Sequence, residues 1–259
     1  LLLGATAFIV NVAITLRRAA TRDALWWALT WALTFLSVTL LLGASLTANL
    51  RLAFLGAVRP IALGAHLHIA LAGWVLLSMV GVSLRLFPMF LLSHGGSDRY
   101  ARWAVWLLAA GAGALSLLHH VPVVGRWLPA LLIVGGVVAF LAQSREFYAH
   151  RHRRALDAGM RLSAMALGGL GLAVPLALVT VTGVASPRVQ VAYVALVLMS
   201  VSAFVVAHYF KIVPFLVWNH RFGPLAGTRP LPRVADLYSA RGALLAVALF
   251  ATGSVVLVT

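Results

Sequence analysis

Eight long apolar stretches follow one another along this chain, with little polar sequence between them. A helix needs about 20 apolar residues to cross a bilayer, so a chain of 259 residues can hold eight such spans with short connections. Only 10% of the residues are charged, against roughly a quarter in soluble domains. We therefore expect an all-α integral membrane protein of about eight transmembrane helices, forming a single transmembrane domain over residues 1–259. The stretches cover residues 1–16, 24–50, 61–92, 102–122, 127–144, 160–184, 189–218 and 239–258.

The basic residues are shared unevenly between the connections. Fourteen arginines lie in the connections after the first, third, fifth and seventh stretches, and four lie in those after the second, fourth and sixth. All five acidic residues share the arginine-rich side. By the positive-inside rule this side faces the cytoplasm, which predicts a bacterial-type inner membrane protein with both termini outside. The basic excess is thus a topology signal, helped by anionic lipid headgroups, and we expect no nucleic-acid partner.

The first stretch could be mistaken for a signal peptide. It is followed by Arg17, Arg18 and Arg22, where a cleaved signal would have small residues at its cleavage site. We therefore expect a membrane span there. Because the chain starts at Leu1, we also expect that its N-terminus has been trimmed.

Two segments that lie 126 residues apart resemble each other position by position. They are RLFPMFLLSH at 85–94 and KIVPFLVWNH at 211–220, and each closes an odd-numbered span. Four spans in each half would give both halves the same orientation, so we expect two parallel four-helix repeats, 1–122 and 127–259. A chance likeness between two basic, proline-containing helix ends is the other interpretation.

Histidine carries most of the chemical information, because the chain has nine histidines and no acid within its spans. Ionisable residues inside a membrane are costly and usually functional. His66 and His68 lie early in the third stretch, about 10 Å below the outer surface by helix rise. His119 and His120 close the fourth stretch, which runs the other way, so the two pairs meet at one level. Residues two apart on a helix point about 200° apart, so His66 and His68 face different neighbours.

Imidazole ligands without thiolate or carboxylate suit haem iron or copper. The chain has no cysteine, which excludes thiolate sites and covalent haem attachment. We expect haem b, one or two groups, with Gly73 leaving room for the macrocycle. One ligand is His68, preferred over His66, and the other is His119 or His120. Copper at the same histidines, and histidines that only bond to carbonyls across helices, are the other interpretations.

A second group of candidate residues lies deeper. His208 is roughly 28 Å from the outer surface by helix rise, the wrong depth to share a ring with His68. A tilt or a later start of its span would raise it toward that ring and make it the main rival ligand. It is predicted to bind an inner cofactor with His94 or His220, or to act as a proton relay or quinone ligand. Arg85 and Lys211 lie where haem propionates, quinone carbonyls or lipid phosphates would meet the helices. Snorkelling to the headgroups is the simpler interpretation for both.

Tryptophan and glycine indicate membrane interfaces and helix packing. The glycine- and alanine-rich runs at 111–115 and 168–171 predict close helix contacts. No phosphate loop, nucleophile triad or carboxylate pair is present, which argues against a hydrolase, a kinase or an ATP-driven pump. The tryptophans that we assign to an interfacial belt are Trp26, Trp27, Trp31, Trp103, Trp106, Trp127 and Trp218.

The run from His66 through His68 and Gly73 to the RLFP motif at 85–88 resembles the early histidine helix of haem–copper oxidase subunit I. It is most similar to the cbb-type branch and its short relatives. In that family the helix begins with the low-spin haem histidine near the outer face, continues through small residues and ends at an inner proline. The resemblance therefore implies that His66 or His68 binds haem. The family has more spans and a copper-ligand helix with His-x-x-x-Tyr that this chain lacks, so we expect no oxygen-reducing centre.

Together these observations predict a membrane haem-b protein that acts as an electron-transfer subunit of a respiratory-type complex. Its expected partners are the lipid bilayer, other subunits of the complex and a quinol pool, and an oxidoreductase activity of its own is left open. A cofactor-free structural or accessory subunit is one alternative. A protein that handles copper or haem transiently is the other.

Overall fold

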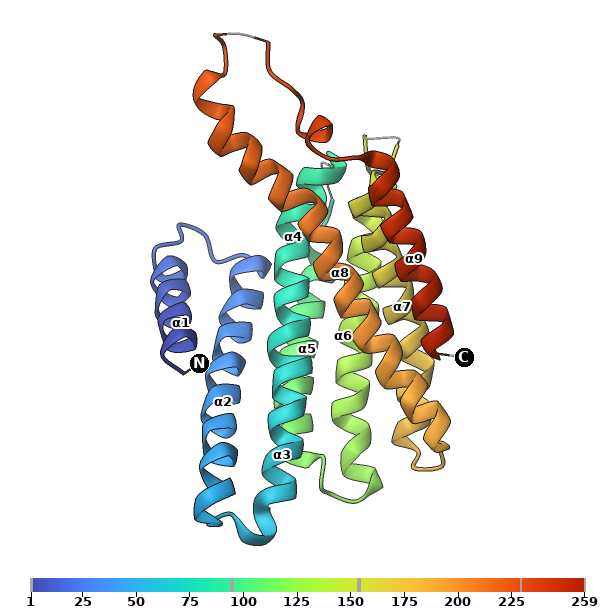
Figure 1. The fold of residues 1–259 in the computed structure, drawn as a ribbon. Helices are drawn as coiled ribbons and strands as arrows, with labels where there is room; N and C mark the ends of the chain where they lie inside the picture. Colours follow the sequence, from blue (N-terminus) through green and yellow to red (C-terminus); the bar gives the residue numbers. More distant parts are fainter. Residues whose placement is uncertain (1, 94–95, 153–154, 229, 259) are drawn as a thin grey trace. The chain divides into compact units, whose positions relative to one another are not determined.

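Each of the eight apolar stretches forms a helix in the computed structural model (Figure 1). The structure describes residues 2–93, 96–152, 155–228 and 230–258, with the backbone alone at 123, 124, 235, 254, 255, 257 and 258. Within these residues no β-strand forms, and an antiparallel bridge joins Ser93 to Arg151. The helices are α1 (Leu2–Arg17), α2 (Ala24–Leu52), η1 (Gly56–Val58), α3 (Arg59–His68), η2 (Ile69–Leu76), α4 (Leu77–Leu91), α5 (Arg99–Leu118), α6 (Val123–Ala149), α7 (Ala158–Val181), α8 (Pro187–Arg221), η3 (Gly223–Leu225), η4 (Val234–Leu237) and α9 (Ala240–Val258).

Six helical segments are long and apolar enough to cross a membrane in the described part of the chain. They are α2, the continuous rod Gly56–Leu91, α5, α6, α7 and α8. The other two apolar helices, α1 and the segment Ala240–Gly253 of α9, are shorter. The chain is therefore a multi-pass helical membrane protein, and eight crossings would require these two short helices to span as well.

Capping side chains start helices where the sequence changes from polar to apolar. Asp23 precedes α2, and its carboxylate accepts the backbone N–H of Trp26 at 2.9 Å. Ser186 precedes α8 and accepts the N–H of Val189 at 3.4 Å, with Pro187 in the first helical turn. Both side chains satisfy backbone donors that a helix leaves unpaired at its start.

The continuous helical segment Gly56–Leu91, which we call the third rod, changes its type of helix near its middle. It is α-helical up to His68, π-helical through η2 and α-helical again in α4. Gly73 lies in the π-helical part, where a Cβ atom would be 2.6 Å from Cγ of Phe35 on α2. The space that we expected Gly73 to leave for a macrocycle is therefore filled by the ring of Phe35. π-Helical segments are rare and frequently lie at functional sites.

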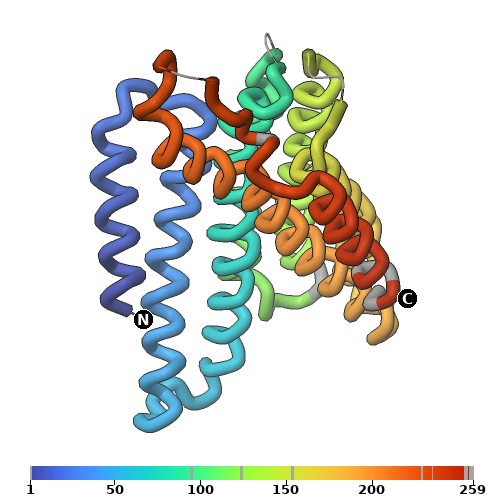
Figure 2. The backbone as a smooth tube through the Cα atoms, turned by 45° about the horizontal axis from the view of Figure 1, so that its top comes forward, coloured from blue at the N-terminus to red at the C-terminus, as the bar shows by residue number. Residues whose placement is uncertain are grey.

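By its internal contacts the chain divides into two compact units. The first contains Leu1–Arg151 and Ala177–Ala185, and the second contains His152–Leu176 and Ser186–Thr259. In the first unit α1 lies beside α2, and α2 lies beside the rod of α3, η2 and α4 (Figures 1 and 2). The connections at both ends of α2 are short, so neighbouring helices run antiparallel.

Glycines let α5 and α6 pack closely in the first unit. A Cβ atom at Gly111 would be 2.7 Å from Cγ1 of Ile133, and one at Gly136 would be 2.6 Å from Cγ of Leu108. The packing role that the sequence predicts for the 111–115 run is thus confirmed at Gly111. At Gly113 an added Cβ would meet nothing within 4 Å.

Glycines also allow close packing of α7 against α8 in the second unit. A Cβ atom at Gly159 would be 2.8 Å from the carbonyl oxygen of Ala207, and one at Gly169 would clash with the hydroxyl of Ser200. This confirms close packing for the 168–171 run at Gly169. Helix α9 packs against α8.

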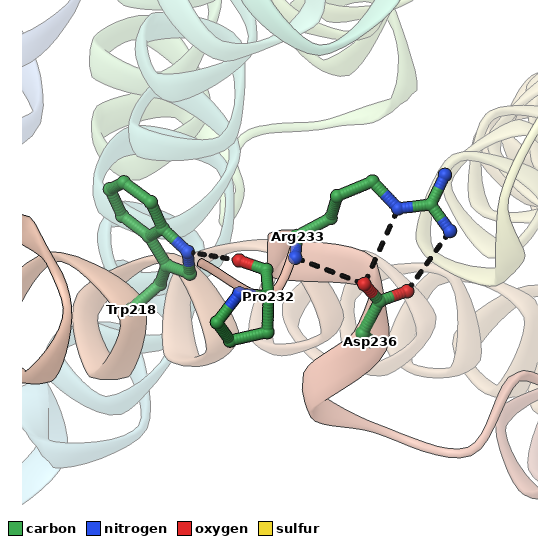
Figure 3. A network of polar contacts seen from close by, with 4 residues as sticks. All are labelled: Trp218, Pro232, Arg233 and Asp236. Carbon is green, nitrogen blue, oxygen red and sulfur yellow. Dashed lines mark hydrogen bonds and ion pairs between the residues drawn. The ribbon is translucent and has the colours of Figure 1, made fainter. Parts of the chain in front are cut away.

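A polar network fixes the connection between α8 and α9 (Figure 3). The indole N–H of Trp218 donates to the carbonyl oxygen of Pro232 at 2.6 Å. The guanidinium of Arg233 donates to the carboxylate of Asp236, and so does the backbone N–H of Arg233 at 3.0 Å. These hydrogen bonds, chiefly the one from the Arg233 side chain, hold the pKa of the Asp236 carboxyl below its ordinary value of 3.8. The Asp236 carboxylate therefore keeps its ion pair with Arg233 to a lower pH than an isolated aspartate would.

Candidate functional site

Four histidines gather in the first unit where α3 and α5 end. We call His66, His68, His119 and His120 the histidine cluster. The ring centroids of His68 and His119 are 5.2 Å apart with the planes at 61°, and those of His119 and His120 are 5.4 Å apart. Two histidine pairs on antiparallel helices therefore do meet at one level, as helix rise predicts.

His66 faces α2 rather than α5. Its Nδ1 atom lies 3.1 Å from the carbonyl oxygen of Thr39, and a Cβ atom at Gly43 would be 3.1 Å from its Cε1 atom. His66 and His68 thus contact different neighbours, as the angle between them on a helix predicts. The contact with Thr39 has the form expected of a structural histidine that bonds across helices.

His119 is held in one orientation by its own helix. Its Nδ1 atom lies 3.0 Å from the carbonyl oxygen of Ser116, and a bond to a carbonyl requires the proton on Nδ1. The lone pair then remains on Nε2, which is how metal-binding histidines are usually oriented. Gly64 of α3 makes room for this ring, because a Cβ atom there would lie 2.7 Å from Cδ2 of His119 and closer still to Nε2.

His68 is the member of the cluster that the protein leaves unsatisfied. Its Nδ1 atom is buried and has no hydrogen-bond partner among the described residues. Buried polar atoms in native proteins almost always have a partner, and an exception requires an explanation. His68 packs edge-on against His119, so an imidazole nitrogen without a partner lies beside a second imidazole whose tautomer is fixed.

Two imidazoles from two helices can share a small metal ion. Within the described residues, no three or more histidine, cysteine, aspartate or glutamate side chains are arranged to hold a metal, which does not suit zinc with its four ligands. Copper accepts imidazole readily, and Cu(I) is stable with few ligands. Copper is therefore the metal to consider for His68 and His119, although the rings are in edge contact and an ion between them would require a ring to turn.

A haem between the same two rings does not fit this arrangement. α3 and α5 pack directly on each other, because Gly64 receives the ring of His119. The rings of His68 and His119 are in contact, and Phe35 fills the space beside Gly73. A macrocycle would need the two helices to move apart.

The deeper residues predicted from the sequence lie in several places. His208 belongs to the second unit and is buried on α8, with Nδ1 2.8 Å from the carbonyl oxygen of Phe204 and its ring 4.1 Å from the Phe204 ring. His220 is exposed in the last turn of α8. Arg85 is exposed on α4. His94 lies outside the residues that the structure describes.

Lys211 does not simply snorkel to the headgroups. Its ammonium group forms an ion pair with the carboxylate of Asp157, with the two side chains only 11% and 17% exposed. The same carboxylate accepts the backbone N–H of Met160 at 3.1 Å and so caps the start of α7. Asp157 was not among the predicted site residues because it lies just outside a span. An aspartate three residues before a helical N–H is a capping signal that could have drawn attention to it.

The fold and the histidine cluster define a class: multi-pass helical membrane proteins with an imidazole pair near one end of a helical unit. Comparison with known proteins adds no family, since no family model, no curated protein and no solved structure matches the chain. The resemblance of residues 66–88 to haem–copper oxidase subunit I therefore stays a prediction from the sequence.

Proposed function

We propose that this membrane protein binds a redox-active metal ion, copper in its reduced form, between His68 and His119. The observation that carries the proposal is the buried Nδ1 atom of His68, which lies beside the ring of His119 and has no hydrogen-bond partner in the described part of the chain. His119 would contribute Nε2, because Ser116 already occupies its Nδ1. His120 is exposed next to His119 and would meet an incoming ion first.

Such a site suits either copper handling or electron transfer as a subunit of a larger membrane complex. The resemblance in the third rod favours electron transfer. Haem b is the second candidate cofactor, supported by the same resemblance and by the early position of the histidines in their helix. Haem b requires α3 and α5 to separate, whereas copper requires only a change of ring orientation, and for this reason we place copper first.

The proposal is tested on the purified full-length chain in detergent. We expect about one Cu(I) per chain by elemental analysis under reducing conditions. His68→Ala and His119→Ala should each weaken copper binding more than a hundredfold, since losing even an outer-shell partner of a metal ligand typically costs 10–100-fold. His150→Ala is the matched control, because His150 is exposed, directly follows α6 and has its Nδ1 atom 3.0 Å from the Glu146 carbonyl oxygen.

An absorbance spectrum of the dithionite-reduced protein separates the candidates. A sharp α band that is present in the wild type and absent in His68→Ala would show that the cofactor is haem b and not copper. If the wild-type chain binds neither copper nor haem, or if His68→Ala binds copper as tightly as the wild type, the proposal fails. The histidines would then be structural, as the bond from His66 to Thr39 already is.

A further inference from the structure

The first unit has two adjoining cavities at the end opposite the histidine cluster. Their volumes are about 230 and 220 Å³. Asp23, Ala24 and Asp98 line both cavities, so the two adjoin at the starts of α2 and α5. The first cavity is also lined by Arg22, Trp27, Arg102 and Trp106. The second is also lined by Leu84, Arg85, Ser97 and Gln143.

The lining carries one net positive charge. Arg22, Arg85 and Arg102 come from three separate segments, and Asp23 and Asp98 oppose them. Arg102 is already paired with Asp98 at 3.3 Å. The site therefore presents Arg22 and Arg85 to a ligand against the remaining carboxylate, which suits a ligand with one negative charge.

Side chains already accept some of the backbone N–H groups at the starts of the two helices. Asp23 accepts the N–H of Trp26 before α2. At α5, Ser97 accepts the N–H of Arg99 and the buried side chain of Gln143 accepts the N–H of Ala101 at 3.0 Å. An anion would therefore be bound by guanidinium groups rather than by helix N-termini.

Tryptophans place this site at the level of the lipid headgroups. Trp27 and Trp106 line the first cavity with ring centroids 5.1 Å apart, and Arg22 stacks on Trp26 at 5.2 Å. Tryptophan is enriched at the boundary between hydrocarbon and water. A ligand there would have its polar part among the arginines and its apolar part against the indole rings.

We propose that this site binds the headgroup of an anionic phospholipid with a hydroxyl-bearing head, of the phosphatidylglycerol type. Arg22 and Arg85 bind the phosphodiester, as guanidinium groups bind phosphate well. The carboxylates of Asp23 and Asp98 accept the hydroxyl groups of the head. A soluble glycerol phosphate shares the same polar chemistry but lacks the apolar part that Trp27 fits.

The lipid site is independent of the proposed metal site. Along α2, Ala24 lies fifteen residues before Thr39, the contact of His66, which is about 23 Å by helix rise. Loss of lipid binding should therefore leave copper binding unchanged, and the two proposals can fail separately.

Native mass spectrometry of the purified, delipidated full-length chain tests the lipid proposal. We expect phosphatidylglycerol to bind, phosphatidylcholine to bind weakly, and millimolar glycerol phosphate not to displace the lipid. Arg22→Gln with Arg85→Gln should weaken phosphatidylglycerol binding roughly 25-fold, since each arginine near an anionic headgroup contributes about fivefold. Arg51→Gln is the matched control, because Arg51 is an exposed arginine at the other end of α2.

Three outcomes would overturn the lipid proposal. The first is unchanged phosphatidylglycerol binding in the double variant, with circular dichroism showing that it is folded. The second is equal binding of phosphatidylcholine and phosphatidylglycerol. The third is displacement of the lipid by glycerol phosphate, which would make this a site for a soluble anion.

Discussion

At the scale of single residues, two glycines decide where the histidines of the cluster can lie. Gly64 receives the ring of His119, and Gly43 receives the ring of His66. The spacing of the histidines predicts that His66 and His68 face different helices, and they do. The part played by the glycines could not be predicted, because it depends on which residues of neighbouring helices lie opposite one another.

Gly64→Ala should displace His119 and destabilise the first unit. The added methyl group would lie within 3 Å of the ring, and such overpacking typically costs about 1–3 kcal/mol in the free energy of unfolding. The measurement is a denaturation curve in mixed detergent followed by circular dichroism. Copper binding should weaken in the same variant, because the ring that supplies Nε2 has moved.

Gly113→Ala is the control for this substitution, because nothing lies within 4 Å of its added Cβ atom. It should leave both copper binding and stability close to those of the wild type. Equal copper affinity in the Gly64→Ala and Gly113→Ala variants would show that His119 is not a ligand.

At the scale of elements, the third rod and the α7–α8 pair differ most from the expectations. The apolar run of residues 69–76 gives no sign of π-helical winding, because its composition is that of any membrane helix. Its contact with Phe35 is a tertiary one. From the sequence, snorkelling to the headgroups is the simpler interpretation of Lys211. Its ion pair with Asp157 depends on the close approach of α8 to Gly159, which the sequence does not reveal.

Removing one partner of the ion pair between Lys211 and Asp157 should lower the free energy of unfolding more than neutralising both partners does. Lys211→Met removes the ammonium group from a largely buried carboxylate that keeps its bond to the N–H of Met160, and losing one partner of a buried ion pair typically costs about 3–5 kcal/mol in the free energy of unfolding. Adding Asp157→Asn should recover most of that loss, because asparagine removes the charge and still caps α7. Detergent denaturation curves of the two variants measure the difference.

Arg102→Met is the matched control for the ion pair. The Arg102–Asp98 pair is exposed, at 62% for both side chains, and exposed ion pairs contribute little to stability. If Lys211→Met destabilises the chain no more than Arg102→Met does, the pair with Asp157 is not structurally important.

At the scale of the whole molecule, hydropathy predicts the helices well and the charges predict a topology. All eight apolar stretches are helical, with ends within a few residues of those expected. The parallel repeats stay a prediction. Pro88 lies three residues before the end of α4, whereas Pro214 lies seven before the end of α8, so the two halves differ locally even where their sequences agree.

Single-cysteine variants test the predicted sidedness, because the natural chain has no cysteine. A membrane-impermeant maleimide added to whole cells should label Thr182→Cys, in a short connection with few charges. It should not label His152→Cys, which lies in an arginine-rich connection, until the membrane is permeabilised. Labelling of position 152 but not 182 in intact cells would invert the topology.

The length of the third rod has a mechanical consequence. The segment Gly56–Leu91 has 36 residues and is about 54 Å long, whereas the hydrocarbon core is about 30 Å thick. A helix this long tilts, and the thickness of the surrounding bilayer sets part of the tilt. Because the same rod carries His68 about a third of the way along and Arg85 near its last turn, a change in membrane thickness would shift both positions together. The lipid environment would then act on the histidine cluster without any ligand binding to it.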